Sequence, residues 1–163
     1  MAIKSISDIS AENFIVDKKA FSKSYFLKKN PALLSTQIIK KLKSNSQGKN
    51  IRICVHAKKN CNLHQMIICQ YKKFSHPAKK HKERDKAYLV LEGKLQVSFF
   101  LKERNRIIKK VCILTKQNKV PLFIPSNTIH HDIPLTNSAI YIEMLGGSFK
   151  SKRSDRIEYN KIH

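Results

Sequence analysis

The sequence predicts a mainly β fold, either a sandwich or a barrel, preceded by a helical extension. After Gly48 the chain becomes a series of short apolar or alternating segments, each of strand length and each bounded by a turn. Many short strands of this kind are typical of sandwiches and barrels. The 163 residues fit one domain, and 41% of them are hydrophobic, which is enough for a packed core and argues against general disorder.

Residues 1–49 are predicted to be helical or irregular. A helix is expected to start at Asn30-Pro31, because Asn can cap a helix and Pro is tolerated at the first helical position. The polar segment 44–48 ends this helix. Residues 12–27 are rich in aromatic side chains and are compatible with a second helix. The apolar residues near helical spacing in the first helix are Leu33, Leu34, Ile38, Ile39 and Leu42.

Residues 50–150 carry the strand signals, and residues 151–163 are expected to form a C-terminal tail. Glu92-Gly93-Lys94 separates two of the strand segments and predicts a β-hairpin. The chain has only 4 glycines, so Gly93 marks a position where the backbone requires one. The predicted strands are 51–55, 66–71, 87–91, 95–99, 107–114, 122–124 and 139–144.

The net charge of +22 favours an anionic partner. Most of the basic residues are Lys and few are Arg, which is not the pattern of bidentate Arg recognition. Lys, Ile and Asn have AT-rich codons, so genome composition is an alternative source of the charge. The excess is concentrated in residues 71–86 and 101–119, which form one positive face if they are neighbours in the fold. Nucleic-acid binding through a Lys-rich face therefore stays open, although no recognised motif supports it.

The sequence predicts a cytoplasmic protein with no membrane span. No apolar run approaches the roughly 20 residues that a membrane-spanning helix needs, and no apolar signal-peptide core follows the N-terminus. Reduced thiols are therefore expected, with Cys54 and Cys69 buried as small core residues. The cysteines lack CxxC spacing, so a zinc knuckle is not indicated.

Histidines gather in the strand-rich part of the chain and bracket the predicted hairpin. The spacing in this region resembles the first motif of the cupin barrels, HxHx4Ex6G. When Gly93 is taken as the closing glycine of the motif, His81 falls on its second His. The chain departs from this motif at two positions. Lys79 stands at the first His, and Lys86 stands at the Glu.

The segment 125–130 resembles the second cupin motif, PxGxxH, and ends at His130. Asn127 takes the glycine place, which is a mild exchange because Asn tolerates positive φ better than most residues. Over residues 50–150 the chain is similar to the WbuC-type cupins, which are found with bacterial surface-polysaccharide genes. The resemblance implies a single cupin-like jelly-roll barrel that forms a homodimer. It is carried by 52–56, 63–68, 86–100, 124–130, Glu143 and 147–149.

Cupins commonly hold one divalent transition metal, such as Zn, Fe, Mn or Ni, with three His and one Glu. The resemblance implies that His81 and His130 are metal ligands. His76 could be a third ligand if the loop of residues 77–80 brings it into the site, and Asp85 could replace the Glu. A protonated Lys repels a dication and cannot ligate it. The alternative is a metal-free pocket whose cationic side chains bind an anion directly. The candidate ligand-binding residues are Arg52, His56, His64, Lys79, Lys86 and Glu143.

Three functions are consistent with these observations. The first is a cupin of lipopolysaccharide or O-antigen metabolism that binds a sugar phosphate or nucleotide sugar. If it is an enzyme, it is a sugar isomerase or epimerase in which His81 or His130 acts as metal ligand or general base. The second is a non-catalytic cupin that binds a small anion at a degenerate metal site. The third is nucleic-acid binding.

Overall fold

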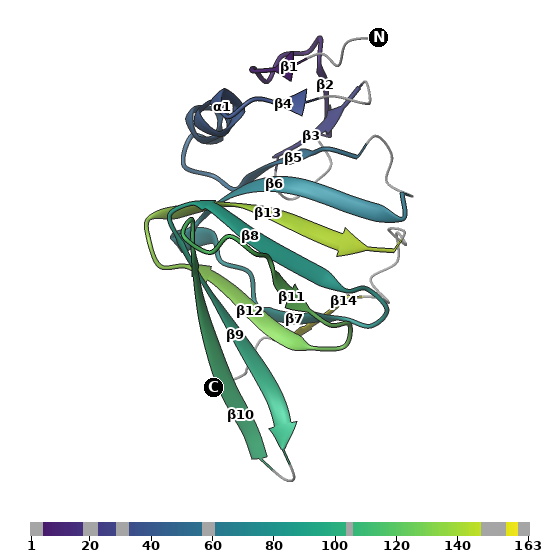
Figure 1. Cartoon of the computed structure of the whole chain (residues 1–163), viewed down its shortest axis with the longest axis vertical. Helices are drawn as coiled ribbons and strands as arrows, with labels where there is room; N and C mark the ends of the chain where they lie inside the picture. Colours follow the sequence, from purple (N-terminus) through teal and green to yellow (C-terminus); the bar gives the residue numbers. More distant parts are fainter. Residues whose placement is uncertain are drawn as a thin grey trace.

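Two β-sheets face one another in the computed structural model (Figure 1). The seven-stranded sheet has the order β11-β8-β13-β6-β5-β3-β2, and the five-stranded sheet has the order β10-β9-β12-β7-β14. The mainly β fold predicted from the sequence is confirmed. The structure describes residues 5–17, 23–28, 33–56, 61–103, 106–147 and 156–159.

Each strand predicted within residues 50–150 is present, and β7, β12 and β14 are additional to the prediction. In sheet order, the seven-stranded sheet contains Leu122–Ile124, Lys86–Glu92, Ser138–Gly146, Leu63–Tyr71, Ile51–Cys54, Lys23–Leu27 and Phe14–Asp17. In sheet order, the five-stranded sheet contains Arg106–Thr115, Lys94–Glu103, Ile129–Pro134, Ala78–His81 and Arg156–Tyr159. Outside these sheets lie β1 (Ser5–Ile6), its parallel partner β4 (Leu33–Leu34) and the 3-10 helix η1 (Lys72–Phe74).

The predicted helix forms, but it starts later than expected. It is α1, Gln37–Ser46, whereas the predicted start at residues 30–31 lies outside the described residues. The Oγ of Ser35 accepts a hydrogen bond from the first amide of the helix at 3.2 Å. The helix ends where predicted, because Gln47 and Gly48 adopt positive φ values of 49° and 75°. No helix in the described part of the chain has the length and hydropathy of a membrane span.

The described part of residues 12–27 forms strands, so the second helix is wrong. β2 and β3 pair antiparallel, and β3 joins the larger sheet by pairing parallel to β5. Phe14, Tyr25 and Leu27 are buried in one cluster, whereas Ile15 is 57% exposed. This alternation is the pattern of a strand with one buried face. The N-terminal segment therefore extends the larger sheet as well as supplying α1.

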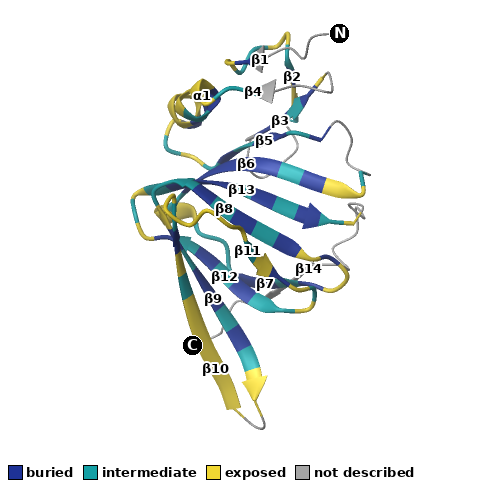
Figure 2. Cartoon of the chain, viewed as in Figure 1, coloured by how far each residue is buried: buried dark blue, intermediate teal, exposed yellow. Residues whose placement is uncertain are grey.

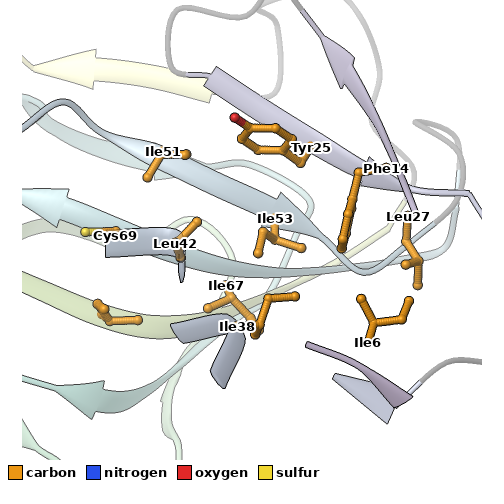
Figure 3. Close-up of a cluster of buried hydrophobic side chains, with 11 residues drawn as sticks. Ile6, Phe14, Tyr25, Leu27, Ile38, Leu42, Ile51, Ile53, Ile67 and Cys69 are labelled. Carbon is orange, nitrogen blue, oxygen red and sulfur yellow. The ribbon is translucent and has the colours of Figure 1, made fainter. Parts of the chain in front are cut away.

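The larger sheet has a hydrophobic core on each of its faces. On the outer face, α1 and the N-terminal strands cover a cluster that includes Leu42 and Cys69 (Figure 3). On the inner face, a second cluster brings Cys54 and Tyr88 together with Val97 of the smaller sheet. Both cysteines predicted to be buried are buried. The middle of β6 is buried on both faces, which explains the apolar run over residues 66–69.

Gly93 forms a corner between the two sheets. β8 pairs with β11 and β13, and β9 pairs with β10 and β12, so the hairpin predicted at residues 92–94 is wrong. The requirement for glycine is nevertheless correct, since φ is +79°. A Cβ at this position would lie 2.6 Å from the Ser138 carbonyl oxygen and 2.7 Å from Thr136 Oγ1. Whether the turn at Gly93 is a hairpin or a corner depends on which strands β8 and β9 pair with. The residues of the turn itself do not indicate this.

Gly93→Ala is expected to lower the free energy of unfolding by about 2–4 kcal/mol, because steric overlap adds to the cost of positive φ. Gly48→Ala is the matched control, since Gly48 also has positive φ but its nearest potential contact, Lys73 Nζ, is 3.9 Å away. The control should lose only about 1 kcal/mol. Urea unfolding of the two variants measures the difference. Equal losses of unfolding free energy in the two variants would show that the neighbours of Gly93 move away from the added Cβ without destabilising the protein.

β9 and β10 form a long hairpin that extends beyond the rest of the smaller sheet (Figure 1). β10 is the edge strand and is exposed along most of its length (Figure 2), with Ile107 68% and Ile113 52% exposed. In the sheet, β9 and β12 separate β10 from β7. The basic stretches 71–86 and 101–119 are therefore not joined into one face by neighbouring strands.

Candidate functional site

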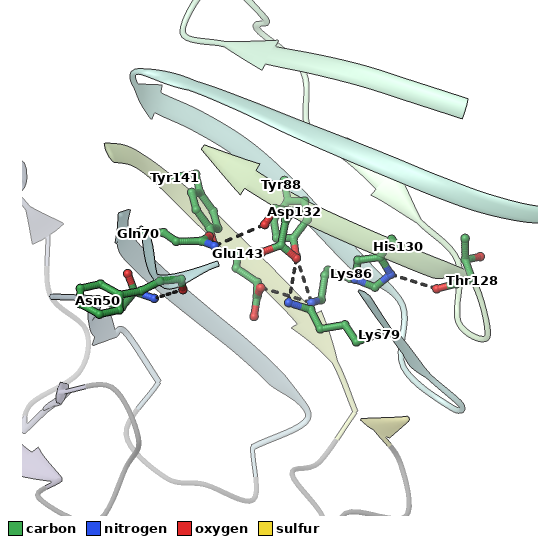
Figure 4. A network of polar contacts seen from close by, with 11 residues as sticks. Asn50, Gln70, Lys79, Lys86, Tyr88, Thr128, His130, Asp132, Tyr141 and Glu143 are labelled. Carbon is green, nitrogen blue, oxygen red and sulfur yellow. Dashed lines mark hydrogen bonds and ion pairs between the residues drawn. The ribbon is translucent and has the colours of Figure 1, made fainter. Parts of the chain in front are cut away.

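Charged and aromatic side chains meet between the two sheets, on the strands that carry the cupin-like motifs (Figure 4). β8 and β13 supply side chains from the larger sheet, and β7 and β12 supply side chains from the smaller one. Side chains two residues apart on a strand point the same way, so each of β8, β12 and β13 contributes a pair. We call this set the inter-sheet cluster, and its buried members are Lys79, Lys86, Tyr88, His130, Asp132, Tyr141 and Glu143.

Two lysine–carboxylate ion pairs form the centre of the inter-sheet cluster. Lys79 Nζ lies 2.7 Å from Asp132 Oδ1, and Lys86 Nζ lies 3.3 Å from Glu143 Oε2. Tyr88 connects the pairs, because its hydroxyl accepts a hydrogen bond from Lys86 at 3.1 Å and donates one to Asp132 Oδ1 at 3.2 Å. The charges of both lysines are therefore balanced by carboxylates inside the protein.

Burial and ion pairing have opposite effects on the pKa values of these groups. Burial raises the pKa of Glu143, but Lys86 and Lys79 outweigh it and bring this pKa down to about 2. The same two lysines hold the pKa of Asp132 well below its usual range despite burial. Burial lowers the pKa of Lys86 to about 8, against the effect of Glu143 and with a contribution from Lys79. At neutral pH both carboxylates are ionised, and Lys86 is protonated in most molecules.

A second set of hydrogen bonds holds the main chain of Asp132. The Tyr141 hydroxyl donates to Gln70 Oε1 at 2.6 Å, and Gln70 Nε2 donates to the Asp132 carbonyl oxygen at 3.3 Å. Burial raises the pKa of Tyr88 and of Tyr141, so both hydroxyls remain protonated donors at neutral pH. Asp132 is thus fixed through its side chain and its backbone.

His130 presents a nitrogen lone pair inside the protein. Its Nδ1 lies 2.9 Å from the Thr128 carbonyl oxygen, which can only accept, so Nδ1 carries the proton. Its buried Nε2 has no hydrogen-bond partner among the described residues. Burial, followed by the charge of Lys86, lowers the pKa of His130 to about 4. The ring is neutral at physiological pH, with its Nε2 lone pair available.

His81 lies beside His130, with 6.4 Å between the ring centroids. Arg84 Nη2 lies 3.3 Å from His81 Nδ1. A guanidinium group can only donate, so Nδ1 accepts and the neutral ring carries its proton on Nε2. The two neighbouring histidines therefore have opposite tautomers.

The predicted residues His56 and His64 form a separate pair, with ring centroids 4.4 Å apart and Phe26 against His56. Burial lowers the pKa of both rings, and His56 and Arg84 lower that of His64 further. Arg84 is thus close to this pair and to His81. The pair borders the inter-sheet cluster on the β6 side of the larger sheet.

The His76 backbone and the Asp85 side chain make their contacts outside the inter-sheet cluster. The segment after His76 forms β7, and the His76 backbone is hydrogen-bonded to the ring of His131. His131 points away from His130 along β12, so the His76 backbone lies on the opposite face of that strand. Asp85 is exposed, and its Oδ1 accepts a hydrogen bond from the Ser126 amide at 2.8 Å. It holds the turn before β12 in place.

The inter-sheet cluster does not fit a resident transition metal. In the part of the chain that the structure describes, no three His, Cys, Asp or Glu side chains lie close enough together to hold one. Two of the motif positions are lysines that are already paired with carboxylates, and an ammonium group repels a dication. Nδ1 of His81 accepts a hydrogen bond from Arg84 and is not available to a metal. The lone pair on Nε2 of His130 is a single ligand, which is not enough for a metal site. This donor set gives no support to the metal implied by the resemblance.

The sequence analysis identified four of the seven buried members of the inter-sheet cluster and missed three. Lys79, Lys86, His130 and Glu143 meet there, whereas Asp132 and the two tyrosines were not candidates. A signal for Asp132 existed, because it follows His130 by two residues on one strand and therefore shares its face. Arg52 is half-buried, and its charge contributes to the low pKa of Glu143.

Comparison with known proteins shows the fold. The sequence matches no family model and no curated protein. Among solved structures, CapF with a bound inhibitor gives a TM-score of 0.53 at 14% identity, over 64% of this chain and 30% of that chain. The capsular polysaccharide assembling protein CapF from Staphylococcus aureus gives 0.52 at 12% identity, over 68% and 34%. Oxalate decarboxylase from Bacillus subtilis gives 0.51 at 12% identity, over 67% and 27%. These proteins are cupins. The chain has a cupin fold.

At this level of identity the likeness extends to the fold and no further. The chain spans about a third of the length of these three solved structures. The cupin-like fold predicted from the two motifs is confirmed. The more specific resemblance to the WbuC-type cupins stays a prediction.

Proposed function

We propose that this cupin binds an anionic sugar, such as a sugar phosphate or nucleotide sugar, between its two sheets without a metal ion. The observation that carries the proposal is His130, a buried neutral imidazole whose Nε2 has no partner among the described residues. Around it, three buried cations face two buried carboxylates, and this excess of positive charge favours an anionic ligand. These five charged residues are Lys79, Arg84, Lys86, Asp132 and Glu143.

The chemistry that this arrangement supports is proton transfer next to a carbonyl group. His130 Nε2 accepts the proton from carbon, and the neighbouring ammonium groups of Lys79 and Lys86 stabilise the enolate that forms. Return of the proton to the same or the adjacent carbon epimerises or isomerises the sugar. The cationic side chains supply the electrostatic stabilisation for this step.

Surface-polysaccharide precursors are the first ligands to test, because CapF is described as a capsular polysaccharide assembling protein and shares the fold. The proposed location is the cytoplasm. UDP-glucose and glucose 6-phosphate should raise the melting temperature of the chain, and neutral glucose at the same concentration should not. An equal response to all three would contradict anion binding at this site.

His130→Asn is expected to lower the rate of deuterium incorporation from D2O into a bound sugar by about 10²–10⁴-fold. Asn keeps a donor for the Thr128 carbonyl but has no basic lone pair at the Nε2 position. NMR of the sugar measures the exchange. His131→Asn, on the same strand but facing the other way, is the control and should exchange like the parent chain. Binding without exchange in the parent chain would instead favour the non-catalytic anion-binding cupin.

Nucleic-acid binding is kept as a second candidate because the β9–β10 hairpin exposes several cations. Lys102, Arg106, Lys109 and Lys110 are all exposed on it. Retention on immobilised RNA that falls steeply with salt, and that is lost when these four residues are changed to Ser, would favour this function. No retention at low salt would contradict it.

The homodimer implied by the family resemblance stays a prediction. We expect the edge strand β10 to be the contact, because it is unpaired on one side within the described sheet and exposes Ile107, Val111 and Ile113. Light scattering on the full chain gives the molar mass. A dimer that becomes a monomer in Val111→Lys would support this contact, whereas a monomeric parent chain would contradict it.

A further inference from the structure

Lys86 is buried in a cluster that holds a second cation, and both features favour the neutral, nucleophilic form of a lysine. Its Nζ is 3.3 Å from Glu143 Oε2 and 3.1 Å from the Tyr88 hydroxyl, and only 2% of its side chain is exposed. The ammonium group of Lys79 belongs to the same cluster and opposes the charge on Lys86. Removal from water and a neighbouring cation are the conditions that activate catalytic lysines. We propose that Lys86 forms an imine with a small anionic aldehyde or ketone that enters between the two sheets.

Lys86 attacks in its neutral form, which is a minority of the molecules at pH 7 because burial lowers its pKa only to about 8. The ammonium proton is released to water, and the neutral amine attacks the carbonyl carbon to form the C–N bond. A proton then moves from nitrogen to oxygen, which gives a carbinolamine. A proton from water is added to the hydroxyl group as the C–O bond breaks, so water leaves, and the ionised Glu143 carboxylate stabilises the iminium ion. One ammonium group and one carbonyl compound thus give one iminium ion and one water molecule, and nothing is oxidised or reduced.

Lys79 provides a comparison within the same cluster. Its ion pair with Asp132 is shorter, at 2.7 Å against 3.3 Å, and the Asp132 side chain is 2% exposed. The Glu143 side chain is 12% exposed, whereas the Lys79 side chain is 7% exposed and that of Lys86 2%, so the two pairs differ in their carboxylates more than in their amines. The shorter ion pair binds the Lys79 ammonium group more strongly. Lys86 is therefore expected to be the more reactive of the two lysines.

The test is reductive trapping of the full chain with glyoxylate, a small anionic aldehyde, and cyanoborohydride at pH 7. An imine is reduced to a carboxymethyl group that peptide mass spectrometry assigns to one lysine. Lys86 should be labelled at least about tenfold faster than exposed Lys116 and than Lys79, because burial lowers the pKa of Lys86 to about 8 and so increases the fraction of its amine that is neutral at pH 7. The same chain unfolded in urea should label all three lysines equally, which calibrates the peptides.

Labelling of Lys86 at or below the rate of Lys116 in the folded chain would overturn the proposal, as would a preference for Lys79. Lys86→Arg keeps a positive charge beside Glu143 but has no amine that can form an imine. In this variant the first, fast adduct of the intact chain should disappear, and the slow labelling of surface lysines should continue. The covalent step goes beyond the proposed function. Glyoxylate is not a sugar, so failure of trapping leaves sugar binding untouched, and failure of sugar binding leaves the imine standing.

Discussion

Asp132→Asn is expected to lower the free energy of unfolding by about 3–5 kcal/mol. The substitution keeps the size of the side chain but removes the charge that balances Lys79, at a site where the carboxylate side chain is 2% exposed. An ammonium group buried without a counter-ion loses its solvation and gains nothing in return. Tyr88 would also donate to a neutral amide oxygen instead of to a carboxylate. Urea unfolding at pH 7 measures the loss.

The double variant Lys79→Met, Asp132→Asn separates loss of the ion pair from loss of the buried contacts. Because no uncompensated charge remains, this variant should recover most of the stability that Asp132→Asn loses. Glu92→Gln is the surface control, since it breaks the Lys43–Glu92 pair, in which both side chains are about half exposed. It should cost no more than about 1 kcal/mol. If the double variant is as unstable as Asp132→Asn, the carboxylate matters for a reason other than balancing Lys79.

Local patterns predicted the strands of residues 50–150 because alternation and apolar runs depend on the burial of each strand's own faces. The segments that were mispredicted depend on distant partners. β3 is a strand because it pairs parallel to β5, and the aromatic residues beside it are equally compatible with a helix. Gly93 has the positive φ of a turn in either case, but β8 and β9 join different sheets. Pairing of this kind is not encoded in a window of a few residues.

The same distinction explains which part of the site could be predicted. Motif spacing located Lys79, Lys86 and His130, because spacing along a strand is a local property. The charge balance was not accessible, since it depends on Asp132 being brought against Lys79 by the pairing of β7 with β12. The lysines that suggested a strongly positive pocket are therefore neutralised in part by carboxylates of the same cluster. The positive excess that remains is small, and it is the charge that the proposed anionic ligand would meet.

Acidification from pH 7 to pH 4 is expected to destabilise the chain, with His130 contributing about 3 kcal/mol of the loss. The pKa of His130 is lowered to about 4 in the folded chain, whereas an unfolded histidine titrates near pH 6.5. Between these values the unfolded chain binds a proton that the folded chain does not, so the stabilisation is complete above pH 6.5 and is lost towards pH 4. Glu143, whose pKa is lowered to about 2, gives a further loss with the same sign below pH 4.5.

His130→Asn should therefore lose about 3 kcal/mol less than the parent chain over the same pH range, as measured by urea unfolding at pH 7, 5.5 and 4. Repulsion within a chain of net charge +22 also grows in acid, but added salt screens repulsion between exposed charges. The contribution of His130 is set by burial, so the difference between the two chains should persist at high salt. A difference that disappears with salt would mean that surface repulsion causes the acid sensitivity, and that the His130 ring is not held neutral between the sheets.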